Sequence, residues 1–178
     1  MALIRASYTV HRGQAYVGQI ADTSLYNIDG ACAADGSVPI GIPVAVQSVQ
    51  PIEGHKVVKL AVDNSLPILG VTIMSHAYSP TGSYDDGVAV NVMTHGRVWV
   101  KASNDLTEAQ ASFDKVVSFD ADGVVTDGGA VKTGYKFTGE ILQGEHAAGE
   151  QPFKLVKIQV LQSVAIPAES ASPSGGGE

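Results

Sequence analysis

Cysteine is almost missing from this sequence, in which Cys32 is the single thiol among 178 residues. One cysteine cannot pair within its own chain, so a small secreted fold held by disulfides is excluded. Cys32 stands in the stretch Ala31-Cys32-Ala33-Ala34, which contains no residue that could activate a thiol. We therefore predict that Cys32 is a small buried side chain.

Long apolar segments are missing as well. No apolar run reaches the about 18 residues that a membrane-spanning helix needs, so the sequence predicts no membrane partner. The first ten residues, MALIRASYTV, have no long apolar core and no cleavage signal. We thus expect neither a membrane anchor nor a secretory peptide.

Charge is scarce, and positive charge is the scarcer sign. Charged residues make up 16% of the chain, with 18 acidic and 11 basic residues and a net charge of −7. The basic residues stand singly, so no basic stripe can neutralise phosphates, and we predict no direct nucleic-acid partner. Low charge with 44% apolar residues indicates either extensive partner contact or a glycine-rich β protein with neutral turns. Both alternatives stay open.

A serine-enzyme site is suggested by two short motifs and is disfavoured by their context. Ser112 and Lys115 fit S-x-x-K, and residues 132–134 fit K-T-G, the motifs of penicillin-recognising enzymes. That chemistry needs the serine at the start of a helix inside a large helical domain, whereas these motifs lie close together in a β-rich stretch. We expect no enzymatic activity; if there were one, Ser112, Lys115 and Lys132 would be its candidates.

Metal-binding patterns are equally weak, and we predict no metal and no cofactor. The stretch Asp120-Ala121-Asp122-Gly123 resembles the start of a calcium loop, but the twelfth position, which should be acidic, is Val131. A hairpin turn is the better interpretation. The five histidines show neither His-x-His nor His-x₃-His spacing, so zinc ligation is unsupported.

Alternation of apolar and polar residues is what the sequence contains instead. Between residues 88 and 101, valines alternate with other residues on both sides of Thr94-His95-Gly96, which predicts two strands joined as a hairpin. Similar patterns occur at residues 44–49, 55–62, 68–74, 116–119, 135–142 and 153–161, the last with a bulge near Leu155-Val156. The one helical signal is a capping-box spacing from Thr107 to Gln110, enough for a turn or two.

About nine strands with frequent glycine turns predict an all-β fold, either a small barrel or a sandwich. We expect residues 1–30 to form an extended N-terminal arm and residues 31–163 to form the β domain. Residues 164–178, rich in Gly, Ser and Pro, have the composition of a flexible tail.

Trp99 admits two interpretations. It alternates with Val98 and Val100 and therefore faces away from them. Either it is buried within its own subunit, or it is exposed beside Arg97 and Lys101. A tryptophan exposed beside an arginine is typical of an interface anchor. Both alternatives stay open.

The stretch from Gly70 to Lys101 resembles the signature region of phage structural cement proteins, which decorate tailed-phage capsids. The resemblance is carried by three pieces, PILGV at 67–71, GVAVNV at 87–92 and GRVWV at 96–100, with Tyr78, Tyr84 and Asp85 in the loop between the first two. The piece GQIAD at 18–22 fits the same family. The resemblance is good over residues 8–103 and weak afterwards.

This resemblance implies a β domain on the outer capsid surface that bridges neighbouring major capsid protein subunits and acts by binding alone. It also implies a virion component, made in the host cytoplasm, that self-associates as a homodimer or homotrimer and reaches adjacent subunits with its arms. The acidic balance fits an outer surface better than one facing DNA. The residues that we predict for such an interface are Tyr8, Val10, Tyr16, Tyr78, Tyr84, Arg97 and Trp99. The alternative is another virion binding module: a head-fibre base, a tail component or a glycan-binding knob.

Overall fold

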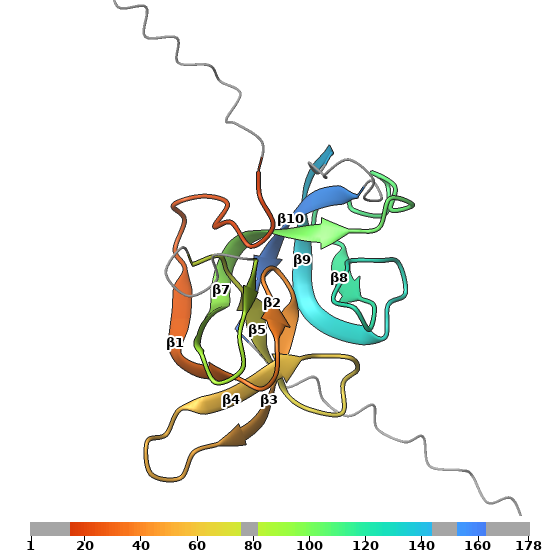
Figure 1. Ribbon diagram of the computed structural model, residues 1–178. Coiled ribbons are helices and arrows are strands. Elements are labelled where there is room, and N and C mark those ends of the chain that lie inside the picture. Colours follow the sequence, from red (N-terminus) through yellow and green to blue (C-terminus); the bar gives the residue numbers. More distant parts are fainter. Residues whose placement is uncertain (1–14, 76–81, 144–152, 163–178) are drawn as a thin grey trace, which may run out of the picture.

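The computed structural model describes residues 15–75, 82–143 and 153–162, and these residues form ten strands and no helix (Figure 1). The strands are β1 (Asn27–Ala34), β2 (Val38–Pro39), β3 (Pro43–Val49), β4 (Lys56–Leu60), β5 (Ile68–Thr72), β6 (Ser83–Tyr84), β7 (Ala89–Ala102), β8 (Val116–Phe119), β9 (Val131–Gln143) and β10 (Lys154–Val160). The predicted all-β class is confirmed, and a barrel is the form it takes.

Five strands close the barrel. Neighbours follow the order β1, β4, β3, β5 and β7, and β7 pairs with β1 to complete the circle. The pair of β1 with β4 is parallel, whereas the other four are antiparallel. Val44, Val58, Val90 and Val92 are fully buried inside. Alternating valines thus mark the inner face of these strands, as their period of two predicts.

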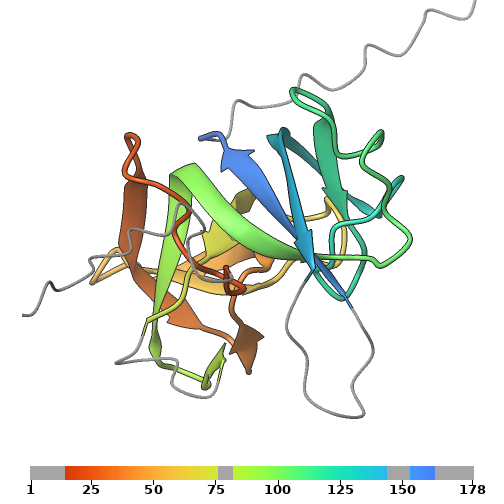
Figure 2. The ribbon, with the colours of Figure 1, turned by 90° about the horizontal axis from the view of Figure 1, so that it is seen from above.

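The strand β7 is shared between the barrel and a second sheet. Residues 89–95 pair with β1 and β5, and residues 96–102 pair with β10, which continues to β9 and β8. Figure 2 shows β7 curving from the side of β1 across to β10 and β9. The inner face of this extension packs a large apolar core that includes Val98, Val100, Phe119, Val156 and Ile158.

The predicted hairpin at Thr94-His95-Gly96 is wrong, because β7 runs through these residues as one strand of 14 residues. Gly96 has φ +127, and a Cβ there would lie 2.6 Å from the Cβ of Tyr26. The glycine therefore permits a close approach of the chain before β1 and a bend in β7, where the sequence pattern suggested a turn.

Two local predictions are confirmed and one is wrong. The bulge predicted near Leu155-Val156 is not in β10, which pairs with β7 without a register shift. The extra residues lie in β9, which advances from Ile141 to Phe137 while β10 advances only from Val156 to Ile158. The capping box forms in a turn, since the Thr107 N–H donates to Gln110 Oε1 (2.8 Å) and the Gln110 N–H donates to Thr107 Oγ1 (3.3 Å). Asp120 belongs to a turn, where its Oδ1 accepts two backbone N–H groups.

Cys32 lies in the barrel core, as predicted, and is 3% exposed. Burial raises the pKa of its thiol to about 12, and the nearby Asp29 carboxylate adds to the effect. The thiol therefore stays protonated at neutral pH, so this side chain serves packing.

The predicted division into arm, domain and tail stays a prediction, since residues 1–14 and 163–178 lie outside the described residues. Within the described part, β1 already begins at Asn27, before the expected domain boundary.

Candidate functional site

Three of the predicted interface residues come together on one surface. Tyr16, Arg97 and Trp99 lie where the chain before β1 crosses β7, on the face of β7, β10 and β9 that points away from the large core. We call this surface, together with residues 15–24, the outer face. It holds the candidate site because it combines aromatic and charged side chains on a rigid sheet.

The other four predicted interface residues are not part of this surface. Tyr84 is fully buried in the barrel core, where its hydroxyl donates to the Ile73 carbonyl oxygen at 2.6 Å. Its observed role is therefore in the fold. Tyr8, Val10 and Tyr78 lie outside the described residues.

Residues 18–21 follow the edge of β7 that β10 leaves free. The Gly18 N–H donates to the Trp99 carbonyl (2.8 Å), the Trp99 N–H donates to the Gln19 carbonyl (3.0 Å), and the Ala21 N–H donates to the Arg97 carbonyl (2.9 Å). These bonds pair Arg97 and Trp99 on one edge of β7, while β10 pairs with the other edge. They also fix the direction in which Tyr16 and Asp22 leave the segment.

Trp99 is buried by this segment, and its side chain is 8% exposed. It packs with Ala15, Ala21 and Leu155, and the ammonium of Lys157 lies 6.0 Å from its ring centre. Of the two alternatives left open by the sequence, the structure therefore shows burial within the subunit. A contribution of Trp99 to contacts with another chain stays a prediction.

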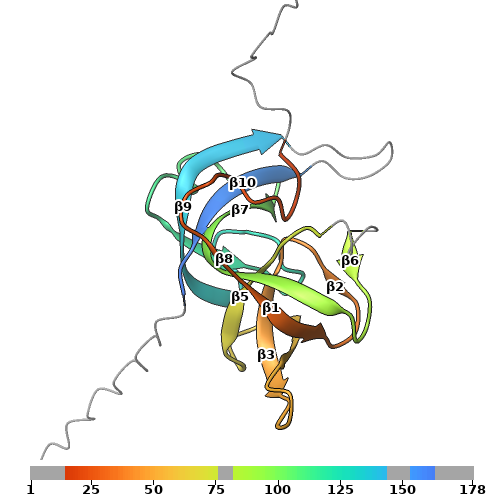
Figure 3. The same ribbon diagram turned by 90° about the vertical axis from the view of Figure 1, so that its left-hand side faces the viewer.

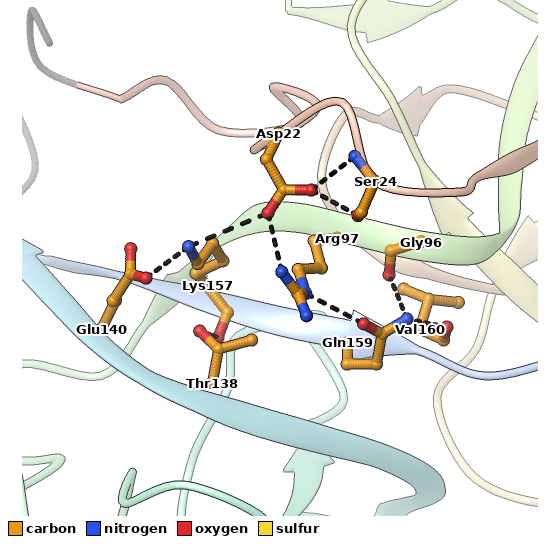
Figure 4. A network of polar contacts seen from close by, with 9 residues as sticks. All are labelled: Asp22, Ser24, Gly96, Arg97, Thr138, Glu140, Lys157, Gln159 and Val160. Carbon is orange, nitrogen blue, oxygen red and sulfur yellow. Dashed lines mark hydrogen bonds and ion pairs between the residues drawn. The ribbon is translucent and has the colours of Figure 1, made fainter.

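A polar network ties the same segment to the sheet (Figure 4). The carboxylate of Asp22 lies 3.1 Å from the Arg97 guanidinium and 4.0 Å from the Lys157 ammonium. Lys157 in turn contacts the Glu140 carboxylate on β9. Ser24 donates to Asp22 from its backbone N–H at 3.0 Å and also from its hydroxyl. Three strands and the incoming segment thus share one set of charges.

These contacts shift the titration of Asp22. Desolvation by burial raises its pKa, but the hydrogen bonds from Ser24 and the bond and charge of Arg97 outweigh that effect and lower it to about 2. Asp22 therefore remains ionised well below neutral pH.

The exposed part of the outer face lies at its rim. Tyr16 is 56% exposed, and Leu142 of β9 is partly exposed next to the buried Leu155. The Arg97 side chain is 41% exposed while it pairs with Asp22. The surface thus offers an aromatic ring, an aliphatic side chain and a cation held in place by the fold, a composition suited to protein contacts.

Reactive chemistry finds little support in the described residues. Within residues 15–75, 82–143 and 153–162, no group of three or more His, Cys, Asp or Glu side chains could hold a metal ion. The ammonium of Lys115 donates to the Ala109 carbonyl at 2.7 Å. Among the same residues, no helix has the length and apolarity needed to cross a membrane.

The sequence analysis missed Asp22, Lys157 and Glu140. The spacing of Asp22 and Ser24 is a usable signal, because Asp-x-Ser favours a turn in which the carboxylate accepts local N–H groups. The partnership with Lys157 and Glu140 has no such signal, since it depends on strands that are far apart in the sequence.

Comparisons with known proteins agree with this architecture. Residues 4–161 match the family described as structural cement protein (E217 gp24/Pam3 gp6). No curated protein matches the chain. Among solved structures, the chain is similar to one in the capsid of Myoviridae phage XM1, with a TM-score of 0.54 and 16% identity. That likeness covers 90% of this chain and 99% of the other, and it shows a shared fold.

The family match extends over most of the chain, from the segment before the barrel to the end of β10. It includes the outer face and all ten strands. The chain therefore belongs to the structural cement protein family of phages, as a virion component that stabilises the capsid.

Proposed function

We propose that this protein binds the outer surface of an assembled phage head and bridges neighbouring major capsid protein subunits. Family membership supports association with the capsid shell. The observation that carries the finer proposal is the outer face, where Tyr16 stands on a segment bonded to β7 and Arg97 of β7 is held by an ion pair with Asp22 of that segment. Preorganised side chains lose little freedom on binding, so they can hold a protein partner efficiently.

The charge of the chain supports a position outside the shell. With a net charge of −7 and no basic stripe, the protein is repelled by packaged DNA. Its scattered cations, such as Arg97 and Lys157, are already engaged by carboxylates.

Stabilisation follows from binding alone. A ligand that binds the assembled shell and not its separated subunits shifts the equilibrium toward the shell by mass action. Each copy needs only a modest interface, because many symmetric copies act together. Self-association into a dimer or trimer would increase this effect, since linked copies bind with higher avidity. The function requires a structural protein rather than a catalyst.

The experiment adds purified protein to expanded shells of its phage that were prepared without it. We expect the protein to sediment with the shells, to raise their disruption temperature and to appear on the outer surface in a reconstruction by electron microscopy. Equal disruption temperatures with and without bound protein would contradict a cementing role. In a reconstruction of the complete virion, density for the protein on a tail or fibre and not on the shell would favour a different virion module.

A further inference from the structure

The hairpin of β3 and β4 ends in a run of exposed residues. Residues 47–54 are all exposed, and Ile52 is the most exposed large apolar side chain of the described residues, at 94%. Figure 3 shows β7, β10 and β9 at one end of the molecule and the turn after β3 at the other. This turn is therefore remote from the outer face.

The exposed turn is nevertheless well ordered. The Gln50 N–H donates to the His55 carbonyl (2.9 Å), and the Gly54 N–H donates to the Gln50 carbonyl (2.8 Å). Gly54 takes a left-handed backbone, φ +72, and Pro51 restricts its own φ beside Ile52. An isoleucine held forward in this way loses little backbone entropy on binding, so the turn is built to present it.

The turn around Ile52 carries little charge. Within residues 47–54 the one charged side chain is Glu53, and the ammonium of the following Lys56 is held by Asp29 on β1 at 2.7 Å. The turn thus contributes a single acidic residue to a chain whose net charge is −7. It can approach another protein with less repulsion than the more acidic remainder of the surface would cause.

We infer that the β3–β4 turn is a second attachment point, in which Ile52 inserts into an apolar pocket of the major capsid protein. The inference rests on the proposed function, and it supplies what bridging needs, two separate binding surfaces on one chain. The partner is the shell rather than a second copy. One turn can bury far less surface than the about 800 Å² per partner of a stable dimer. On a capsid lattice, however, the area buried by the turn adds to the other contacts of the same protein.

The test compares three variants with the wild-type protein on shells prepared without it. Ile52→Asn removes the apolar tip, Ile52→Val keeps most of it, and Val62→Asn is the matched control, because Val62 is 50% exposed after β4. Thermal melts establish that each variant is folded. Sedimentation with shells gives the affinity, and analytical ultracentrifugation gives self-association.

We expect Ile52→Asn to bind shells about tenfold more weakly or worse, with unchanged melting and self-association. Ile52→Val and Val62→Asn should stay within about twofold of the wild type. If the wild type binds and Ile52→Asn binds equally well, the inference fails while the proposed function stands. If Ile52→Asn instead abolishes self-association, the partner is a second copy and the inference is overturned. A wild-type protein that does not bind shells overturns both.

Discussion

The segment before β1 and the turn after β3 are two loops of opposite character. Residues 15–24 are bonded to β7 along their backbone, cover Trp99 and place Asp22 among cations. Residues 47–54 project from the barrel, are all exposed, and form their backbone hydrogen bonds within their own hairpin (Figure 1). The difference indicates that the first loop contributes to the stability of the fold, whereas the second is free to act on a partner. Each prediction below tests that contrast.

Truncation of Trp99 should have the largest effect on stability. Trp99→Ala removes the ring that residues 15–21 cover and leaves a cavity between them and β10. We expect the free energy of unfolding to fall by about 3–5 kcal/mol, measured by urea denaturation at fixed protein concentration. Trp99→Phe should recover much of the loss. Normal melting with lowered shell occupancy would instead assign Trp99 to an interface.

The ambiguity of Trp99 in the sequence has a physical origin. Both faces of β7 are covered, by the large core on one side and by residues 15–21 on the other. Alternation in the sequence separates the residues of the two faces of a strand. When both faces are buried, the alternation cannot show that Trp99 is buried as well as the valines. The sequence of residues 15–21 has no sustained alternation of apolar and polar residues. It therefore did not predict that this segment packs on β7.

The strands themselves were largely predictable, because alternating valines line the barrel. The predicted hairpin at Gly96 was wrong because glycine permits both a turn and a close contact. The contact is with Tyr26, which lies in a distant part of the chain. Tyr84 was misleading for a related reason. Tyrosine is common at interfaces, but here its hydroxyl finds a buried carbonyl partner.

A matched pair of glycines separates packing from backbone strain. Gly41 and Gly54 have nearly the same left-handed backbone, φ +71 and +72, so alanine costs similar strain at both. A Cβ at Gly41 would lie 2.4 Å from Val17 and 3.0 Å from the Gly18 nitrogen, whereas nothing lies within 4 Å at Gly54. We expect Gly41→Ala to destabilise more than Gly54→Ala by about 1–3 kcal/mol in denaturation experiments.

Equal losses for the two alanine variants would show that residues 17–18 move aside at no cost. The packing of the segment before β1 against the rest of the fold would then stabilise the protein no more than that of the exposed turn after β3, and the contrast between the two loops would disappear.

Loss of the Asp22 carboxylate should cost less and should depend on pH. Its folded pKa of about 2 lies below the unfolded value of about 3.9, so its stabilisation is present above pH 4 and lost as pH falls toward 2. We expect Asp22→Asn to lower the free energy of unfolding by about 1–2 kcal/mol at pH 7, after allowing for screening by solvent. At pH 2 the variant and the wild type should converge, as denaturation curves at both pH values would reveal.

Asp63→Asn is the control for this effect. Asp63 accepts the Ser65 N–H at 2.8 Å in a turn like that of Asp22 and Ser24. This change therefore removes the charge of a similar turn acceptor, whose oxygen can still accept the N–H, without removing an ion pair to the sheet. A loss as large for Asp63→Asn as for Asp22→Asn would assign the stabilisation to the turn alone.

Removal of the Tyr16 ring should have the smallest effect on stability and should act on binding. The ring is 56% exposed, while the Tyr16 backbone N–H, which any residue supplies, donates to Gln19 Oε1 at 2.9 Å. Tyr16→Ser should therefore change the free energy of unfolding by no more than about 0.5 kcal/mol. If the outer face contacts the capsid, shell occupancy measured by sedimentation should fall several-fold.

Tyr26→Ser, which removes another partly exposed tyrosine outside this face, should leave occupancy near the wild-type value. Unchanged occupancy for Tyr16→Ser would mean that the tightly held segment serves stability alone, and that attachment depends on other surfaces such as the β3–β4 turn.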